Sequence, residues 1–149
     1  MLQLLQVALM LVSLCCPIIA VAQDDISVRS GPYEVFYSAF NTSFLSPEVA
    51  TATGVVRAKD RVLVNISIRR DKGNTTEAVS AHKIEGSSFD LIHRKTLDFE
   101  EVVEPGAIYY LAEFKLNNDN EMVVLDIEVT PNEGDTPIDV SFKRNFFLN

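Results

Sequence analysis

Few side chains in this chain of 149 residues could catalyse a reaction. Histidine occurs only at His82 and His93, and cysteine only at Cys15 and Cys16. A serine or cysteine hydrolase needs a histidine that an acid orients beside a nucleophile. The sequence has neither a G-x-S-x-G nucleophile turn nor a glycine-rich phosphate loop. We therefore expect no catalytic residue and no enzyme activity.

Carboxylates are more numerous, and they suggest two other kinds of site. Asp126 and Glu128 would lie about 7 Å apart on one strand face, as glycosidase carboxylates can. Such enzymes also need a deep aromatic cleft, and the chain has no tryptophan. Asp119, Glu121 and Asp135 lie in the oxygen-rich turns 117–121 and 132–135, where Ca²⁺ could bind. Because Asn and Asp are also ordinary turn residues, we expect no cofactor, with calcium as the alternative.

The amino terminus has the pattern of an export signal. Residues 1–22 carry no charge, 18 of them are apolar, and the segment ends in Ala20-Val21-Ala22, which is typical of a signal peptidase site. An uncleaved anchor is the alternative, because about 20 apolar residues can span a bilayer. We expect cleavage after residue 22 and a periplasmic protein without a stable membrane anchor. The remaining domain, residues 23–149, would contain no cysteine.

The charge of the chain is negative and unevenly distributed. The formal net charge is −8, and residues 96–139 contain 12 acidic side chains but one basic one, Lys115. Nucleic acids and anionic lipids attract Lys and Arg, so we expect neither as a partner. A solvated sheet face that maintains solubility is the simplest interpretation of the acidic half. A cationic partner or Ca²⁺ is the alternative.

Apolar and polar residues alternate through most of the chain, which indicates β-strands. Seven to nine short strands with turn residues between them predict an all-β fold, a single immunoglobulin-like antiparallel β-sandwich. A small barrel is the alternative. Residues 46–53 predict one short helix, with Ser46 as its cap and Gly54 after its end. We expect residues 54–70 to form a hairpin around 58–60, and residues 89–95 to be strand-like.

Two runs of the sequence are similar to a known family. GPYEVFYSAFNTSFLSPEVATATGVVRAKDRVLVNISI (31–68) and AIYYLAEFKL (107–116) resemble small exported gammaproteobacterial proteins called domain of unknown function 4426. The resemblance spans residues 23–149 and implies a single exported β-rich domain. It implies no catalytic residue and no ligand. Thr53 departs from the family pattern, which has an aromatic residue there.

Several apolar side chains lie on strand faces opposite the expected core faces: Tyr33, Val35, Tyr37, Leu63, Tyr109 and Leu111. Gathered on one outer face, they would form a patch for a protein partner. Alternatively, the core faces are assigned wrongly or the 46–53 helix covers the patch. We expect a non-catalytic protein-binding or accessory module of the cell envelope. Its partner would contact Tyr33, Tyr37, Tyr109 and Leu111, or add a strand to an exposed edge; the alternative is a calcium-stabilised envelope protein. The sequence indicates no oligomeric state.

Overall fold

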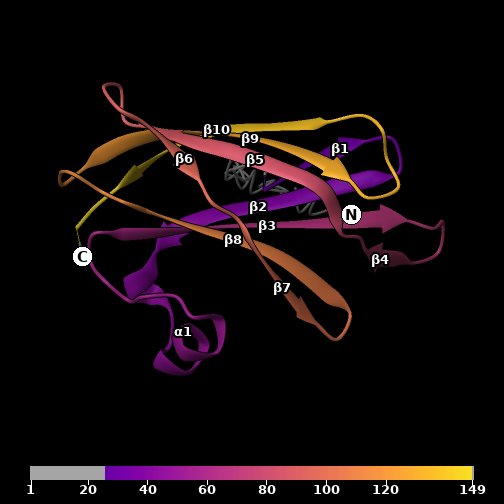
Figure 1. The fold of residues 1–149 in the computed structure, drawn as a ribbon, viewed down its shortest axis with the longest axis horizontal. Coiled ribbons are helices and arrows are strands. Elements are labelled where there is room, and N and C mark those ends of the chain that lie inside the picture. Colours follow the sequence, from indigo (N-terminus) through magenta and orange to yellow (C-terminus); the bar gives the residue numbers. More distant parts are fainter. Residues whose placement is uncertain (1–25, 149) are drawn as a thin grey trace, which may run out of the picture.

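The computed structural model describes residues 26–148 and is an all-β sandwich of two antiparallel sheets with one α-helix (Figure 1). Sheet A has the order β1 (Ser27–Ser30), β2 (Tyr33–Asn41), β3 (Arg61–Asp71), β8 (Ala107–Lys115) and β7 (Glu100–Glu104), and β4 (Thr76–Ala78) also pairs with β3. Sheet B has the order β10 (Ile138–Phe146), β9 (Glu121–Pro131), β5 (Ala81–Phe89) and β6 (Arg94–Leu97).

The prediction of an all-β sandwich is confirmed. The described residues form ten strands rather than seven to nine, because β1 adds a strand before β2 and residues 75–85 divide into β4 and part of β5. The predicted signal segment, residues 1–22, lies outside the described residues. Within residues 26–148, no helix is long and apolar enough to cross a membrane.

The expected hairpin over residues 54–70 is wrong. Residues 54–60 contain no strand, and the whole length of β2 pairs with β3, from Tyr33 opposite Arg70 to Asn41 opposite Val62. The connection between these strands is closed by Thr42, whose hydroxyl donates to the Ala58 carbonyl (3.1 Å) and accepts from its N–H (3.0 Å). The two ends of the long connection therefore lie close together, and β2 pairs directly with β3.

Residues 89–95 are also not a continuous strand. Leu91 has a φ of 74°, which is left-handed backbone that ends an extended segment. The chain turns there between β5 and β6.

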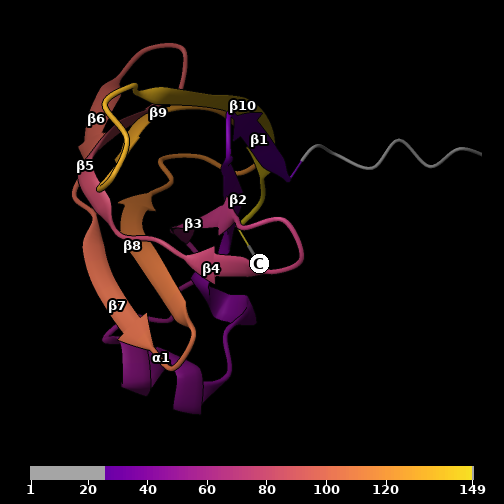
Figure 2. The same cartoon turned by 90° about the vertical axis from the view of Figure 1, so that its right-hand side faces the viewer.

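The predicted helix is confirmed as α1 (Pro47–Thr53). Ser46 accepts a hydrogen bond from the Val49 N–H at 3.3 Å, and Gly54 follows the helix with a φ of 72°, a conformation that glycine adopts at little cost. The helix lies against the outer face of sheet A, away from sheet B (Figure 2). Leu63 points to this outer face; it is 4% exposed and does not belong to the inter-sheet core.

The main core lies between the two sheets. On β3, Val62, Val64, Ile66 and Ile68 are fully buried, as their alternation predicts. Aromatic pairs join the sheets: Tyr37 stacks on Phe142 with centroids 4.6 Å apart, and Phe114 meets Phe146 edge to face at 5.9 Å. The sandwich is thus held mainly by apolar burial.

A glycine in β5 makes room for the segment that crosses between the sheets. A Cβ on Gly86 would lie 3.1 Å from Phe99 Cε2 and 3.1 Å from Ile127 Cγ1. Phe99 lies between β6 and β7, which belong to different sheets. The bare backbone at Gly86 therefore lets the Phe99 ring pack closely against sheet B.

Candidate binding surface

The four predicted partner-binding residues lie on two different faces of sheet A. Tyr33 and Tyr37 pack against the inter-sheet core. Tyr109 and Leu111 point the other way, because they alternate with the buried Tyr110 and Ala112. The expectation that all four lie opposite the core face is therefore wrong for the two β2 tyrosines. The structure does not place the four side chains in one patch.

The outer face of sheet A is nevertheless rich in apolar side chains. Besides Leu63, it carries half-buried apolar residues that are not part of the inter-sheet core: Phe36, Phe40, Val102, Tyr109 and Leu111. Cross-strand register places Leu111 between Asn65 of β3 and Glu100 of β7. The sequence prediction did not include Phe36, Phe40 and Val102. Strand β2 is apolar on both faces, so its alternation gives no signal for Phe36 or Phe40. Both faces of sheet A thus carry large apolar side chains, although polar residues such as Asn65 and Ser67 interrupt them on the outer face. Sheet B covers only the inner face.

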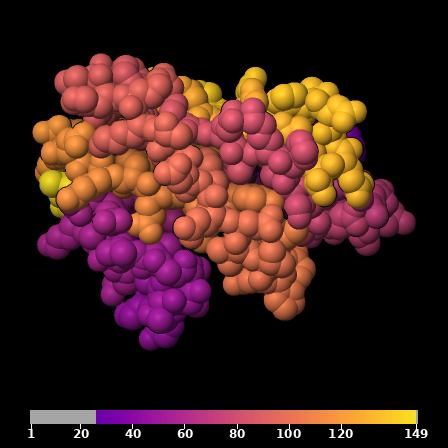
Figure 3. Space-filling model, in the orientation of Figure 1, coloured from indigo at the N-terminus to yellow at the C-terminus, as the bar shows by residue number. Residues whose placement is uncertain are grey.

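A hollow of about 280 Å³ interrupts this outer face between the end of α1 and the β7–β8 hairpin. These two segments project side by side with a notch between them (Figure 3). We call the hollow of about 280 Å³ the α1–β7 hollow. Its apolar lining is Val55, Leu63, Val102 and Leu111, its charged lining is Arg61, Asp98, Glu100 and Glu113, and Thr53 and Gly54 complete it. It combines apolar contact surface with a charged rim.

The charged groups of the α1–β7 hollow are not equally engaged. Arg61 Nη1 lies 3.1 Å from Glu113 Oε2, and Glu113 Oε1 accepts a 3.4 Å hydrogen bond from the Val56 N–H. The side chains of Asp98 and Glu100 are exposed and form no hydrogen bond or ion pair with any residue in 26–148. Because Arg61 offsets Glu113, the hollow keeps two uncompensated negative charges.

The three residues considered for calcium do not converge. Asp119 Oδ1 accepts from the N–H groups of Asn120 (3.0 Å) and Leu148 (2.9 Å), and Glu121 Oε2 accepts from Asn117 and Asn118. Asp135 lies beyond the other end of β9, whose 11 residues span about 33 Å. Within the described chain, no three His, Cys, Asp or Glu residues could together hold a metal ion.

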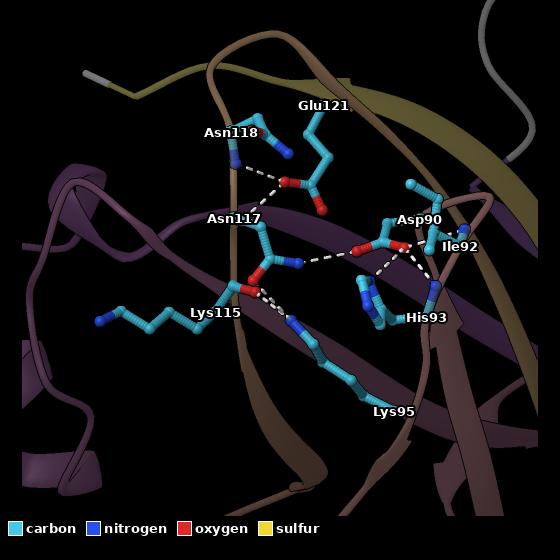
Figure 4. A network of polar contacts seen from close by, with 8 residues as sticks. All are labelled: Asp90, Ile92, His93, Lys95, Lys115, Asn117, Asn118 and Glu121. Atoms are coloured by element: carbon cyan, nitrogen blue, oxygen red, sulfur yellow. Dashed lines mark hydrogen bonds and ion pairs between the residues drawn. The ribbon is translucent and has the colours of Figure 1, made fainter.

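Glu121, the first residue of β9, belongs to a polar network that connects the β5–β6 turn to the β8–β9 turn (Figure 4). Asp90 Oδ1 accepts from the N–H groups of His93 (2.6 Å) and Ile92 (3.1 Å), and Asp90 Oδ2 accepts from Asn117 Nδ2 (2.7 Å). These hydrogen bonds, chiefly that from the His93 N–H, lower the pKa of Asp90 to about 2. The network therefore stabilises turns and links the two sheets.

The two histidines do not form a catalytic arrangement. His82 is exposed near the start of β5, and His93 follows its far end. The His93 Nδ1 atom lies 3.5 Å from Asp90 Oδ1, and its side chain is 65% exposed. Within residues 26–148, neither imidazole hydrogen-bonds to a hydroxyl group.

The outer face of sheet B differs from that of sheet A because it carries a row of acidic side chains. Glu128 of β9 lies directly opposite Glu85 of β5 on one side and Asp139 of β10 on the other. Lys83 pairs with Glu85 at 2.9 Å. Directly opposed like charges destabilise a sheet, so this row lowers the stability of the fold.

Replacing Glu128 by glutamine is therefore expected to raise the free energy of unfolding by about 0.2–1 kcal/mol. The gain should shrink at high salt, because salt screens exposed charges. Urea unfolding at low and high ionic strength measures both effects. Glu104→Gln is the control, since Glu104 lies opposite Ala107. An equal gain in the two variants would contradict the assigned repulsion.

Comparison with protein families identifies the domain. The family model described as domain of unknown function, DUF4426, matches residues 27–149. The chain belongs to the DUF4426 family. A DUF4426 family protein from Pseudomonas aeruginosa PAO1 has a similar crystal structure, with a TM-score of 0.68 and 36% sequence identity; the match covers 83% of this chain and 94% of that one. A comparison with curated proteins found no match. The resemblance noted in the sequence is thus confirmed for the whole described DUF4426 domain.

Proposed function

We propose that this DUF4426 protein is an exported, non-catalytic binding module of the cell envelope that holds a protein partner on the outer face of sheet A. One observation carries the proposal: sheet A carries large apolar side chains on both faces, and sheet B covers only one of them. On the outer face Leu63 is 4% exposed, whereas Tyr109 and Leu111 are half-buried. A half-covered apolar face of this kind suits a protein interface.

Two features of the chain support the rest of the proposal. The uncharged apolar segment 1–22 with its Ala20-Val21-Ala22 end favours export and cleavage. The outer face of sheet A offers apolar contact rather than a convergent set of catalytic groups. Binding, followed by release or by scaffolding of the partner, is the activity that such a surface can perform.

Site-specific photo-crosslinking in living cells tests this proposal. A photoreactive residue is placed at Tyr109 and, separately, at Leu111, and adducts are identified by mass spectrometry. We expect the same partner at both positions and a protein that begins at residue 23 in the periplasmic fraction. Replacing Leu111 by Asp should weaken binding of the purified partner roughly tenfold, the effect of losing a significant interface contact.

Ser141 provides the matched control position, because it lies on the outer face of sheet B beside Asp126. The photoreactive residue at Ser141 should give no adduct with the same partner. Absence of adducts at both Tyr109 and Leu111 in folded, exported protein would refute the proposal. Equal labelling at Ser141 would also count against a defined binding face.

A further inference from the structure

The α1–β7 hollow lies within the proposed binding face and has a chemistry of its own. Val102 and Leu111 come from neighbouring edge and interior strands, and Val55 follows the helix. Val55 is 8% exposed, so this part of the hollow's wall is packed. A ligand group that enters here contacts apolar surface before it reaches the rim.

The rim selects the sign of the charge that can enter. Arg61 is already paired with Glu113, whereas the exposed carboxylates of Asp98 and Glu100 have no partner within residues 26–148. An anionic group would meet two like charges, and a purely apolar group would leave both carboxylates poorly solvated. A cationic group on an apolar stem satisfies both parts of the hollow.

Lysine and arginine side chains have this form, because their methylene stems pack on apolar surface while their charged ends remain at the rim. We propose that the α1–β7 hollow receives a lysine or arginine side chain from a basic segment of the partner protein. The stem lies against Val102 and Leu111, and the cation pairs with Asp98 and Glu100. This inference rests on the proposed function, since it names the partner chemistry for the same surface.

A titration of the purified protein with defined peptides tests the inference. The probes are an end-blocked peptide of alternating lysine and leucine and its counterpart with glutamate in place of lysine. Backbone amide NMR signals of Gly54, Val102 and Leu111 report binding at the hollow. We expect the lysine peptide to shift these signals and the glutamate peptide to leave them unchanged.

Paired variants separate a specific site from general charge attraction. Asp98→Asn with Glu100→Gln should weaken lysine-peptide binding roughly three- to tenfold, the size expected for losing two exposed ion pairs. Glu128→Gln with Asp139→Asn removes the same net charge from the outer face of sheet B and should leave binding nearly unchanged. Both pairs alter exposed or half-exposed side chains, and thermal unfolding verifies that each variant folds.

Equal binding by wild type and the Asp98/Glu100 variant, or shifts centred on sheet B, would overturn the inference. The crosslinking experiment distinguishes failure of the proposed lysine or arginine site from failure of the proposed function. If Tyr109 still captures its partner in the Asp98/Glu100 variant with undiminished yield, the binding face stands and the basic segment is excluded. If Tyr109 and Leu111 capture nothing in the wild-type protein, the proposed function itself fails.

Discussion

Tyr110→Phe is expected to lower the free energy of unfolding by about 1–2 kcal/mol, the net contribution of the two hydrogen bonds that it removes. The Tyr110 hydroxyl donates to Glu101 Oε2 at 2.5 Å and accepts from the Ala81 N–H at 2.7 Å. It therefore ties β7 and β8 of sheet A to the start of β5 in sheet B. Tyr110 itself is 4% exposed, whereas Glu101 is exposed and Ala81 is partly buried, so water can solvate the groups left behind only in part. Equilibrium urea unfolding measures the change.

The same substitution should alter the dependence of stability on alkaline pH. Burial, and then the hydrogen bond to Glu101, raise the pKa of Tyr110 above its ordinary value. The folded protein thus holds the phenol proton more tightly than the unfolded chain does. This contribution is complete below the unfolded-state pKa of about 10 and is lost as the pH rises through the folded-state pKa. The difference between wild type and Tyr110→Phe should therefore narrow at high pH.

Tyr109→Phe is the matched control, because Tyr109 is half-buried and its hydroxyl makes no hydrogen bond within residues 26–148. Its stability should change by less than about 0.5 kcal/mol, as for ordinary surface substitutions. Equal losses in Tyr109→Phe and Tyr110→Phe would show that the inter-sheet hydrogen bonds contribute nothing.

Gly86→Val has the second large expected effect, a loss of about 1–3 kcal/mol from overpacking. A Cβ atom at position 86 would lie 3.1 Å from side-chain atoms of Phe99 and Ile127, and 3.3 Å from the Asp126 carbonyl oxygen. A branched side chain must displace the Phe99 ring and loosen the crossover from β6 to β7. Thermal and urea unfolding measure the loss.

A double-mutant cycle with Phe99→Leu tests whether that ring is the cause. The penalty of Gly86→Val should be smaller in the Phe99→Leu background, because part of the clash has been removed. An unchanged penalty in both backgrounds would assign the strain to the backbone or to Ile127 instead.

Local signals in the sequence predict elements better than they predict pairings. The α1 helix follows from Ser46, Pro47 and Gly54, which act within one or two turns of chain. The inward residues of β3 follow from strict alternation. The pairing of β3 with β2 does not follow, because it depends on how Thr42 and Ala58 close a connection whose ends meet only in the folded structure.

The candidate surface was predictable only in part, for a related reason. Tyr109 and Leu111 alternate with a clear core face, so their outward direction could be predicted. The β2 residues Tyr33, Val35 and Tyr37 belong to a strand that is apolar on both faces, and period-two alternation then cannot choose between them. The α1–β7 hollow needs residues from α1, β3, β7 and β8 together, which no local pattern reveals.

The order of strands within the sheets also has a consequence for the time at which this domain can fold. The central pairings join distant parts of the chain, as Arg61 opposite Lys115 and Ala81 opposite Pro131 show. Neither sheet can be completed until β8 and β9 have been synthesised. Folding dominated by such distant contacts takes roughly milliseconds to seconds. The first half of the polypeptide therefore leaves the ribosome as an incomplete sheet, and the native state forms only after the C-terminal strands arrive.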